Sequence, residues 1–181
     1  MSRLLKQKLI LVDGYNVIGI WPRLQESYRI HGLETARRDL IEAMVNYSAS
    51  QDFNTRIVFD SQYQYTPTVK EVITDRLSVY YTEFGQTADT YIEKACADLR
   101  QEMRLSKSRL IVATSDRVQQ LTVAGYGAEW ISSQQLGHDI ESAASKVRRK
   151  FQGSKRTSGR FLANYLDPES QKRLAELRMG K

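Results

Sequence analysis

The sequence has few of the residues that would allow a disulfide framework or a zinc site. Its 181 residues include one cysteine, Cys96, and two histidines, His31 and His138. A single cysteine cannot form an internal disulfide or supply a cysteine-rich zinc cluster, and Cys96 lies in an apolar helical pattern that indicates core. Two histidines are too few for a histidine-based metal site unless carboxylates supply most of the ligands. Any metal site would therefore use mainly oxygen ligands.

Long apolar runs are also missing. No stretch reaches the roughly 18 apolar residues of a membrane-spanning helix, because Asp13, Gly14 and Asn16 interrupt the apolar start. That start has no small-residue cleavage site and predicts a strand rather than a signal peptide. We therefore expect a cytoplasmic protein with no membrane segment. Ten glycines and three prolines are too few for a disordered chain.

The net charge of +6 is distributed unevenly. Residues 1–145 carry 16 Lys or Arg against 18 Asp or Glu, whereas residues 146–181 carry 11 against 3. The length fits one ordinary domain, so we expect a folded domain over 1–145 and a basic extension over 146–181. Such a basic block is typical of a protein that binds a phosphate-rich partner. On charge alone, the alternative is a solvated tail that aids solubility.

Short apolar runs alternate with amphipathic patterns along the domain. Strands are predicted at residues 8–12, 55–61, 77–83, 110–113 and 128–132, and helices at 33–51, 89–105, 117–124 and 133–151. The stretch before residue 33 is expected to be irregular, and residues 61–75 a long loop bordering the site. A short terminal helix is predicted at Asp167 and Pro168. Alternating strands and helices indicate an α/β fold with a mostly parallel central sheet.

Acidic residues recur at the carboxyl ends of the predicted strands. Asp13 follows the first strand, Asp89 begins the helix after the third, and Asp116 follows the strand at 110–113. In an open parallel sheet, ligands bind beyond these ends, near the point where strand order reverses. Asp60, at the end of the second strand, and Glu93, one helical turn after Asp89, are further candidates.

Converging carboxylates favour a particular chemistry. They raise one another's pKa values unless a cation neutralises them, and oxygen ligands select Mg²⁺ or Mn²⁺. One or two such ions can polarise a phosphodiester and lower the pKa of the attacking water. The pattern therefore predicts phosphodiester hydrolysis without a protein nucleophile.

Each acid also has a purely structural explanation. Asp89 could be a helix N-terminal residue favoured by the helix dipole, Asp116 could cap the next helix, and Asp60 could be a turn residue. Asp13 is harder to explain in this way, because a carboxylate directly after four apolar strand residues loses hydration without a partner. Their recurrence at one sheet edge favours a functional site.

Four segments resemble, in order and spacing, the NYN-domain proteins of the YacP-like type. They are VDGYNVIG (12–19), VFDS (58–61), QTADTYIEK (86–94) and TSDRVQQ (114–120). The resemblance covers roughly residues 8–145, and LDPE (166–169) also resembles the C-terminal part of that family. It implies a PIN-like three-layer αβα sandwich and a Mg²⁺- or Mn²⁺-dependent ribonuclease.

The resemblance also implies roles for individual residues. By position, Asp13, Asp89 and Asp116 match the metal-binding acids of the family, and Asn16 matches the polar residue of the first motif, so these four are the predicted catalytic residues. Asp60 and Glu93 lie where such families sometimes have an additional acid.

The basic extension is expected to contact RNA. Its candidate residues are Lys146, Arg148, Arg149, Lys150, Lys155, Arg156 and Arg160. They could follow phosphates while Phe151 or Phe161 stacks on a base, although core packing is the preferred role of both rings. Proteins recognise RNA largely through single-stranded or shaped segments. We therefore predict that the endoribonuclease cleaves exposed RNA rather than regular duplex.

The basic extension and the resemblance together extend this expectation to a ribosome-associated substrate, with the ribosome as a partner. Two other functions remain open: an inactive RNA- or ribosome-binding module of the same fold, and a small-molecule phosphohydrolase that would not need the basic extension.

Overall fold

The computed structural model describes residues 8–61 and 69–164, with side chains described as far as Gln152. Contacts divide the chain into two compact units, residues 1–141 and 142–181. The first unit contains the sheet, and the second contains most of the last helix. The expected boundary, from charge alone, is at residue 145.

Within the described residues, six strands form one mixed, mostly parallel sheet in the order β3-β4-β2-β1-β5-β6. The strands are β1 (Lys8–Asp13), β2 (Asn54–Phe59), β3 (Val69–Val72), β4 (Leu77–Tyr81), β5 (Arg109–Ala113) and β6 (Glu129–Ile131). Only β3 runs antiparallel, beside β4. In the register of the centre, Val12 lies opposite Ile57 of β2 and Ala113 of β5. Strand order reverses at β1, so the carboxyl ends of β1 and β5 border the usual ligand position of an open sheet.

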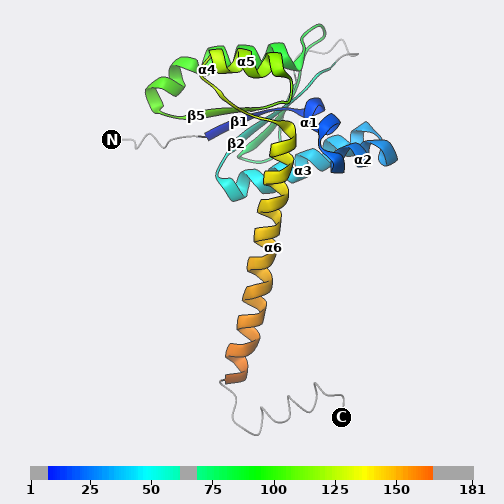
Figure 1. The fold of residues 1–181 in the computed structure, drawn as a ribbon, viewed down its shortest axis with the longest axis vertical. Coiled ribbons are helices and arrows are strands. Elements are labelled where there is room, and N and C mark those ends of the chain that lie inside the picture. The colour runs from blue at the N-terminus through cyan, green and yellow to red at the C-terminus, as the bar shows by residue number, and fades with distance from the viewer. Residues whose placement is uncertain (1–7, 62–68, 165–181) are drawn as a thin grey trace. The chain divides into compact units, whose positions relative to one another are not determined.

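Helices lie on both sides of the sheet (Figure 1). On one side are α1 (Gly14–Ile20), α2 (Pro22–His31) and α3 (Leu33–Gln51), and on the other are α4 (Ala88–Ser106) and α5 (Arg117–Gly125). The last helix, α6 (Ser133–Asn164), follows β6. The predicted α/β fold, with three layers and a mostly parallel sheet, is confirmed.

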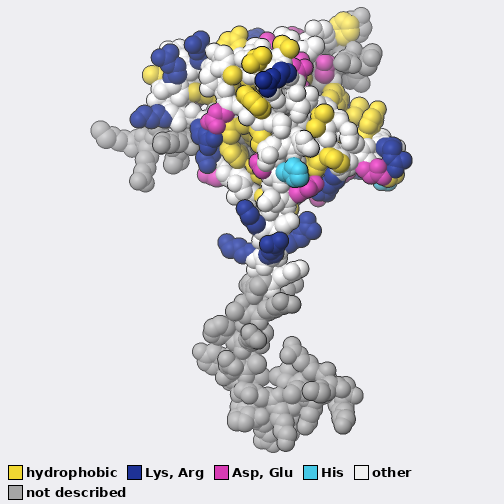
Figure 2. All heavy atoms as spheres, in the orientation of Figure 1, with side chains coloured by type: hydrophobic (Ala, Val, Ile, Leu, Met, Phe, Trp, Pro, Cys, Tyr) yellow, Lys and Arg dark blue, Asp and Glu magenta, His cyan; other side chains and the backbone are white. Residues whose placement is uncertain are grey.

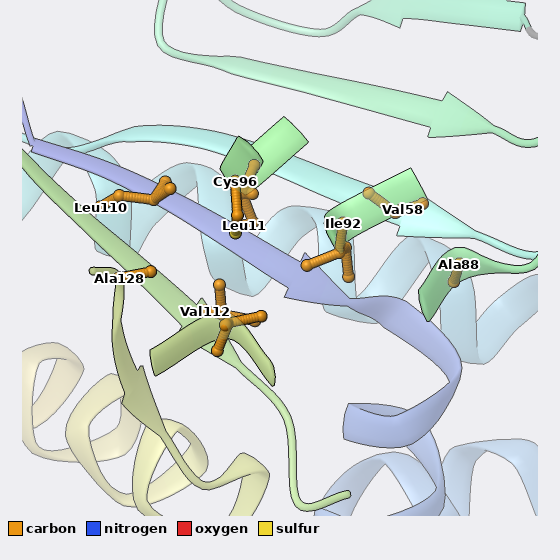
Figure 3. Packing of buried hydrophobic residues seen from close by; sticks show 9 residues of the cluster. Leu11, Val58, Ala88, Ile92, Cys96, Leu110, Val112 and Ala128 are labelled. Carbon is orange, nitrogen blue, oxygen red and sulfur yellow. The ribbon is translucent and has the colours of Figure 1, made fainter. Parts of the chain in front are cut away.

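The central strands supply core residues to both sides, because successive side chains of a strand point to opposite faces. Toward α4, Leu11 and Val112 pack with Ile92 and Cys96 (Figure 3). Val12 is also fully buried, and by alternation it faces the layer of α3. Cys96 is the buried core residue that its helical pattern indicated, and burial raises the pKa of its thiol to about 12.

Two segments expected to be irregular contain regular structure. Asp13 caps α1, and Pro22 stands in the first turn of α2, where its missing N–H is not needed. Trp21 separates these helices and donates from Nε1 to Glu141 Oε1 at 2.9 Å. Helix α1 is short and contains two glycines, so its sequence has too little periodicity to predict a helix. Strand β3 lies in the expected loop, and all four of its residues are exposed, which leaves no apolar pattern to mark it.

The helix expected at 133–151 continues to Asn164. Glycine, serine and threonine near Gly153 each disfavour a helix interior by at most about 1 kcal/mol, which a long helix tolerates. The terminal helix expected at Asp167 and Pro168, and Tyr63 and Tyr65 of the expected loop, lie outside the described residues. Among the described helices, none is long and apolar enough to cross a membrane.

Candidate active site

Asp13 is a buried carboxylate at the carboxyl end of the central strand. Its side chain is only 8% exposed, and Oδ1 accepts one hydrogen bond from the backbone N–H of Asn16 at 3.1 Å. Burial raises its pKa from 3.8 to about 6; the bond from Asn16 opposes this shift, and the charges of Asp89, Asp116 and Asp60 add to it. One N–H donor does not offset the lost hydration of the charge, so Asp13 is incompletely compensated.

Asp116 lies at the N-terminus of α5, beside the end of β5. Its Oδ1 accepts hydrogen bonds from the backbone N–H groups of Val118 at 2.8 Å and Gln119 at 3.0 Å. Asp116 is therefore the helix cap that its position after Thr114 and Ser115 suggested. Both bonds go to one oxygen, and the side chain is exposed, so capping leaves Asp116 available to a ligand.

Asp89 lies in the first turn of α4, which Thr87 caps. Burial raises the pKa of Asp89, and the charges of Asp116, Glu93 and Asp60 raise it further. The helix dipole favours a negative charge here, which is the structural explanation. However, the neighbouring acids raise the pKa of Asp89, whereas a helix dipole would lower it. A favourable position at a helix N-terminus therefore does not explain why Asp89 lies beside other acids.

Gln119 joins two of these acids. Its Nε2 donates to Asp89 Oδ1 at 2.6 Å, and its backbone N–H donates to Asp116. The residue is 2% exposed, and Oε1 is buried without a hydrogen-bond partner among the described residues. Sequence reasoning missed Gln119. The sequence feature that could have identified it is its spacing of four residues before Val123, which places a polar residue on the buried face of α5.

Asn16 connects three segments beneath the acids. Its Oδ1 accepts from the backbone N–H of Ser115 at 2.8 Å and from the hydroxyl of Ser133 at 2.6 Å. Ser115 Oγ in turn accepts from the backbone N–H of Ser133 at 3.0 Å. These bonds tie α1 to the loop before Asp116 and to the start of α6. Asn16 is a predicted catalytic residue, and the structure shows that the donors of Ser115 and Ser133 both occupy its carbonyl oxygen.

The two remaining acids lie at the same edge. Asp60 directly follows β2 and is half-buried, and its charge acts on both Asp13 and Asp89. Glu93 is half-buried one turn along α4, and its charge acts on Asp89. The charges of Asp60, Asp89 and Asp116 act on Asp13, whereas that of Glu93 acts on Asp89, so the predicted acids lie at one edge of the sheet.

An aromatic row borders the acids on the side of α3. The ring of Tyr15 packs against Phe59 with centroids 5.1 Å apart, and Phe59 stacks on Tyr81 at 5.8 Å. Arg37 lies 6.0 Å from the Phe59 and Tyr81 ring centroids, and its Nη1 donates to Tyr15 Oη at 3.4 Å. Tyr15 is therefore part of a packed row beside the site. Sequence reasoning did not single out Arg37.

The donor chemistry of this edge fits a hard divalent cation, because carboxylate oxygens dominate it and repel one another. The spacing of the acidic side chains fits a bound cation less well than their chemistry does. Within the described residues, no three acidic, histidine or cysteine side chains are already gathered at metal-binding spacing. Local bonds direct Oδ1 of Asp13 and of Asp116 toward backbone N–H groups. The acids share one edge, but they are not preassembled around one point.

The basic segment of α6 belongs to the second unit. Its described cations, all exposed, are Lys146, Arg148, Arg149 and Lys150. On the face shown in Figure 2, Lys and Arg side chains gather along this part of the helix. Phe151 is 69% exposed, so the preference for a core role is wrong for this ring. The side chains of Lys155, Arg156, Arg160 and Phe161 lie outside the described ones.

The three-layer fold with a mostly parallel sheet is a PIN-like NYN fold. The chain belongs to the YacP-like NYN domain family, whose profile matches residues 10–179. The resemblance seen in the four sequence motifs is thereby confirmed. Membership supports a nuclease-like, RNA-related function in general.

Individual relatives agree with this assignment. The chain is 32% identical over 142 residues to the uncharacterized protein YacP of Bacillus subtilis (strain 168), a match that covers 78% of this chain and 80% of that protein. The crystal structure of a mutant of Rae1 (YacP) from B. subtilis matches with a TM-score of 0.68 and 27% identity, covering 94% and 99% of the two chains. Another crystal structure of Rae1 (YacP) gives a TM-score of 0.65 and 29% identity, covering 95% of each chain.

Proposed function

We propose that the protein is a metal-dependent endoribonuclease that hydrolyses phosphodiester bonds in exposed RNA. The observation that carries the proposal is Asp13, a carboxylate 8% exposed at the point where strand order reverses, with three other acids acting on it. A buried, ionised carboxylate without a cationic partner lowers the stability of the protein. Buried, incompletely compensated carboxylates of this kind are typical of functional sites.

In this proposal, Asp13, Asp89 and Asp116 hold Mg²⁺ or Mn²⁺, and Asp60 and Glu93 are further ligands. When bound, the cation supplies polarisation of the phosphodiester and a lower pKa for the attacking water. Asn16 keeps the loop before Asp116 close to α1 through its bond to Ser115.

The basic segment of α6 supplies affinity for RNA in the same proposal. Exposed Lys146, Arg148, Arg149 and Lys150 neutralise phosphates, and Lys155, Arg156 and Arg160 extend the series. Exposed Phe151 offers a ring for base stacking. Messenger RNA on the ribosome is the proposed cellular substrate, and cleavage-site mapping in cells with and without the active protein tests it.

The decisive experiment compares two variants on helix α4. Asp89→Asn removes a proposed ligand, whereas Asp98→Asn changes an exposed acid of the same helix. Cleavage of a labelled single-stranded RNA with Mn²⁺ should fall in Asp89→Asn by more than the roughly 10–100-fold typical of residues that only support a ligand. Asp98→Asn should cleave like wild type. Undiminished cleavage by Asp89→Asn contradicts the proposed chemistry.

A second function, an RNA-binding module without activity, is favoured by one observation: among the described residues, the acids are not gathered at metal-binding spacing. Calorimetric titration of the wild type with Mn²⁺ separates the two functions. Absence of Mn²⁺ binding, together with salt-sensitive RNA binding that survives Asp13→Asn and Asp89→Asn, would support the binding module.

A further inference from the structure

A single buried residue, through its side chain and its backbone, bridges the N-termini of the two helices that carry Asp89 and Asp116. Gln119 donates from Nε2 to Asp89 Oδ1 at 2.6 Å, while its backbone N–H donates to Asp116 Oδ1 at 3.0 Å. Two carboxylates on different helices therefore share one residue as donor. Because the side chain is 2% exposed, water does not compete freely for this bond.

The neighbouring residue shows what a purely structural glutamine does on this helix. Gln120 is also buried, and its Nε2 donates to the backbone carbonyl of Thr114 at 2.9 Å, which satisfies an acceptor of the chain itself. Gln119 instead donates to a half-buried carboxylate, and its own Oε1 is buried without a partner among the described residues. An unpaired buried carbonyl costs stability. A glutamine at position 119 therefore serves Asp89 better than it serves packing.

The amide is also oriented by its charge partner. An ionised carboxylate has acceptors but no donor, so Nε2 of Gln119, and not Oε1, must face Asp89. A bond to one oxygen of Asp89 restricts the rotation of that side chain and directs the other oxygen elsewhere. Residues in contact with metal ligands commonly act in this way, by setting the orientation of the ligand.

We propose that Gln119 is a positioning residue that orients Asp89 and couples it to Asp116, so that the two carboxylates can bind one divalent cation together. The inference rests on the proposed function. It goes beyond that function by assigning the cation affinity in part to a residue that is not itself a ligand.

The test uses the same substitution at both glutamines of the full-length protein. Gln119→Met keeps an unbranched side chain and the backbone bond to Asp116, but removes the donor to Asp89 and the unpaired oxygen. Gln120→Met removes one bond to the backbone of Thr114. In EDTA, both variants should unfold below the wild-type temperature, because each loses one hydrogen bond of a buried amide.

Mn²⁺ affinity by calorimetry is the main readout. Gln119→Met should bind Mn²⁺ roughly 10–100-fold more weakly than wild type, and Gln120→Met should bind it like wild type. Cleavage by Gln119→Met should recover as Mn²⁺ is raised, and RNA binding in EDTA should not change. Wild-type Mn²⁺ affinity in Gln119→Met, or equal losses in both variants, overturns the role of Gln119 and leaves the proposed function standing. A wild type that binds no Mn²⁺ overturns both.

Discussion

Replacement of Asp13 by Asn should make the metal-free protein more stable. Burial and neighbouring charges raise the folded-state pKa of Asp13 from 3.8 to about 6. This shift corresponds to about 3 kcal/mol of unfavourable free energy for the ionised form in the fold. Asn keeps the size of the side chain and an oxygen for the N–H of Asn16, and it brings no charge that must lose its hydration.

The sign of this effect depends on pH. Below about pH 4, Asp13 is protonated in both the folded and the unfolded state, and its ionisation costs nothing. Between about pH 4 and 6 the unfolded state releases the proton first, so the wild type loses stability relative to Asp13→Asn. Above about pH 6 the difference is constant, at about 3 kcal/mol. For a chain of this length it corresponds to roughly 6–12 °C in Tm.

The assay is urea unfolding followed by circular dichroism from pH 4 to 8 in EDTA, with Asp98→Asn as the exposed-acid control. Asp98→Asn should show no comparable pH-dependent gain. Excess Mn²⁺ should then stabilise the wild type by about 2.7 kcal/mol at 100 times its Kd, and Asp13→Asn by much less. If Asp13→Asn is less stable than wild type at pH 7 in EDTA, the carboxylate is fully compensated in the fold and the reasoning fails.

Three further predictions concern Asn16, Gly14 and the cations of α6. Asn16→Ala should lower the free energy of unfolding by about 2 kcal/mol, because two partly buried hydrogen bonds lose their acceptor. Asn46→Ala on the exposed face of α3 should change it little, and urea midpoints measure both. Gly14→Ala should destabilise by about 1–3 kcal/mol, because its Cβ would lie 2.3 Å from the buried ring of Phe59. Gly19→Ala on the same helix has nothing within 4 Å and should be neutral or stabilising by up to about 1 kcal/mol in the same assay. Replacement of the four described cations of α6 by Gln should weaken the salt dependence of single-stranded RNA binding. The slope of log binding constant against log salt concentration should fall by about 0.7 for each phosphate that is no longer neutralised. Fluorescence anisotropy measures this slope, and an unchanged slope would exclude this segment from the RNA interface. The four cations are Lys146, Arg148, Arg149 and Lys150.

The sheet was predictable because its signal is local. Each parallel strand at the centre of the fold has an apolar run that needs no partner to be recognised, and the acids at their ends stand out against it. Strand β3 was missed because an exposed edge strand has no apolar face. Helices α1 and α2 were missed because α1 is short and contains two glycines, and α2 has one buried residue, Leu24, so neither has an apolar period.

The site divides in the same way. The sequence alone determined which acids could act, since Asp13, Asp60, Asp89 and Asp116 follow or adjoin strand ends that a parallel sheet must bring to one edge. Only the tertiary structure decided how they are held. Gln119 reaches Asp89 across 30 positions of the chain, and Asn16 reaches Ser115 across 99. Hydrogen bonds between residues so far apart depend on how helices pack on the sheet, and no spacing along the chain encodes that packing.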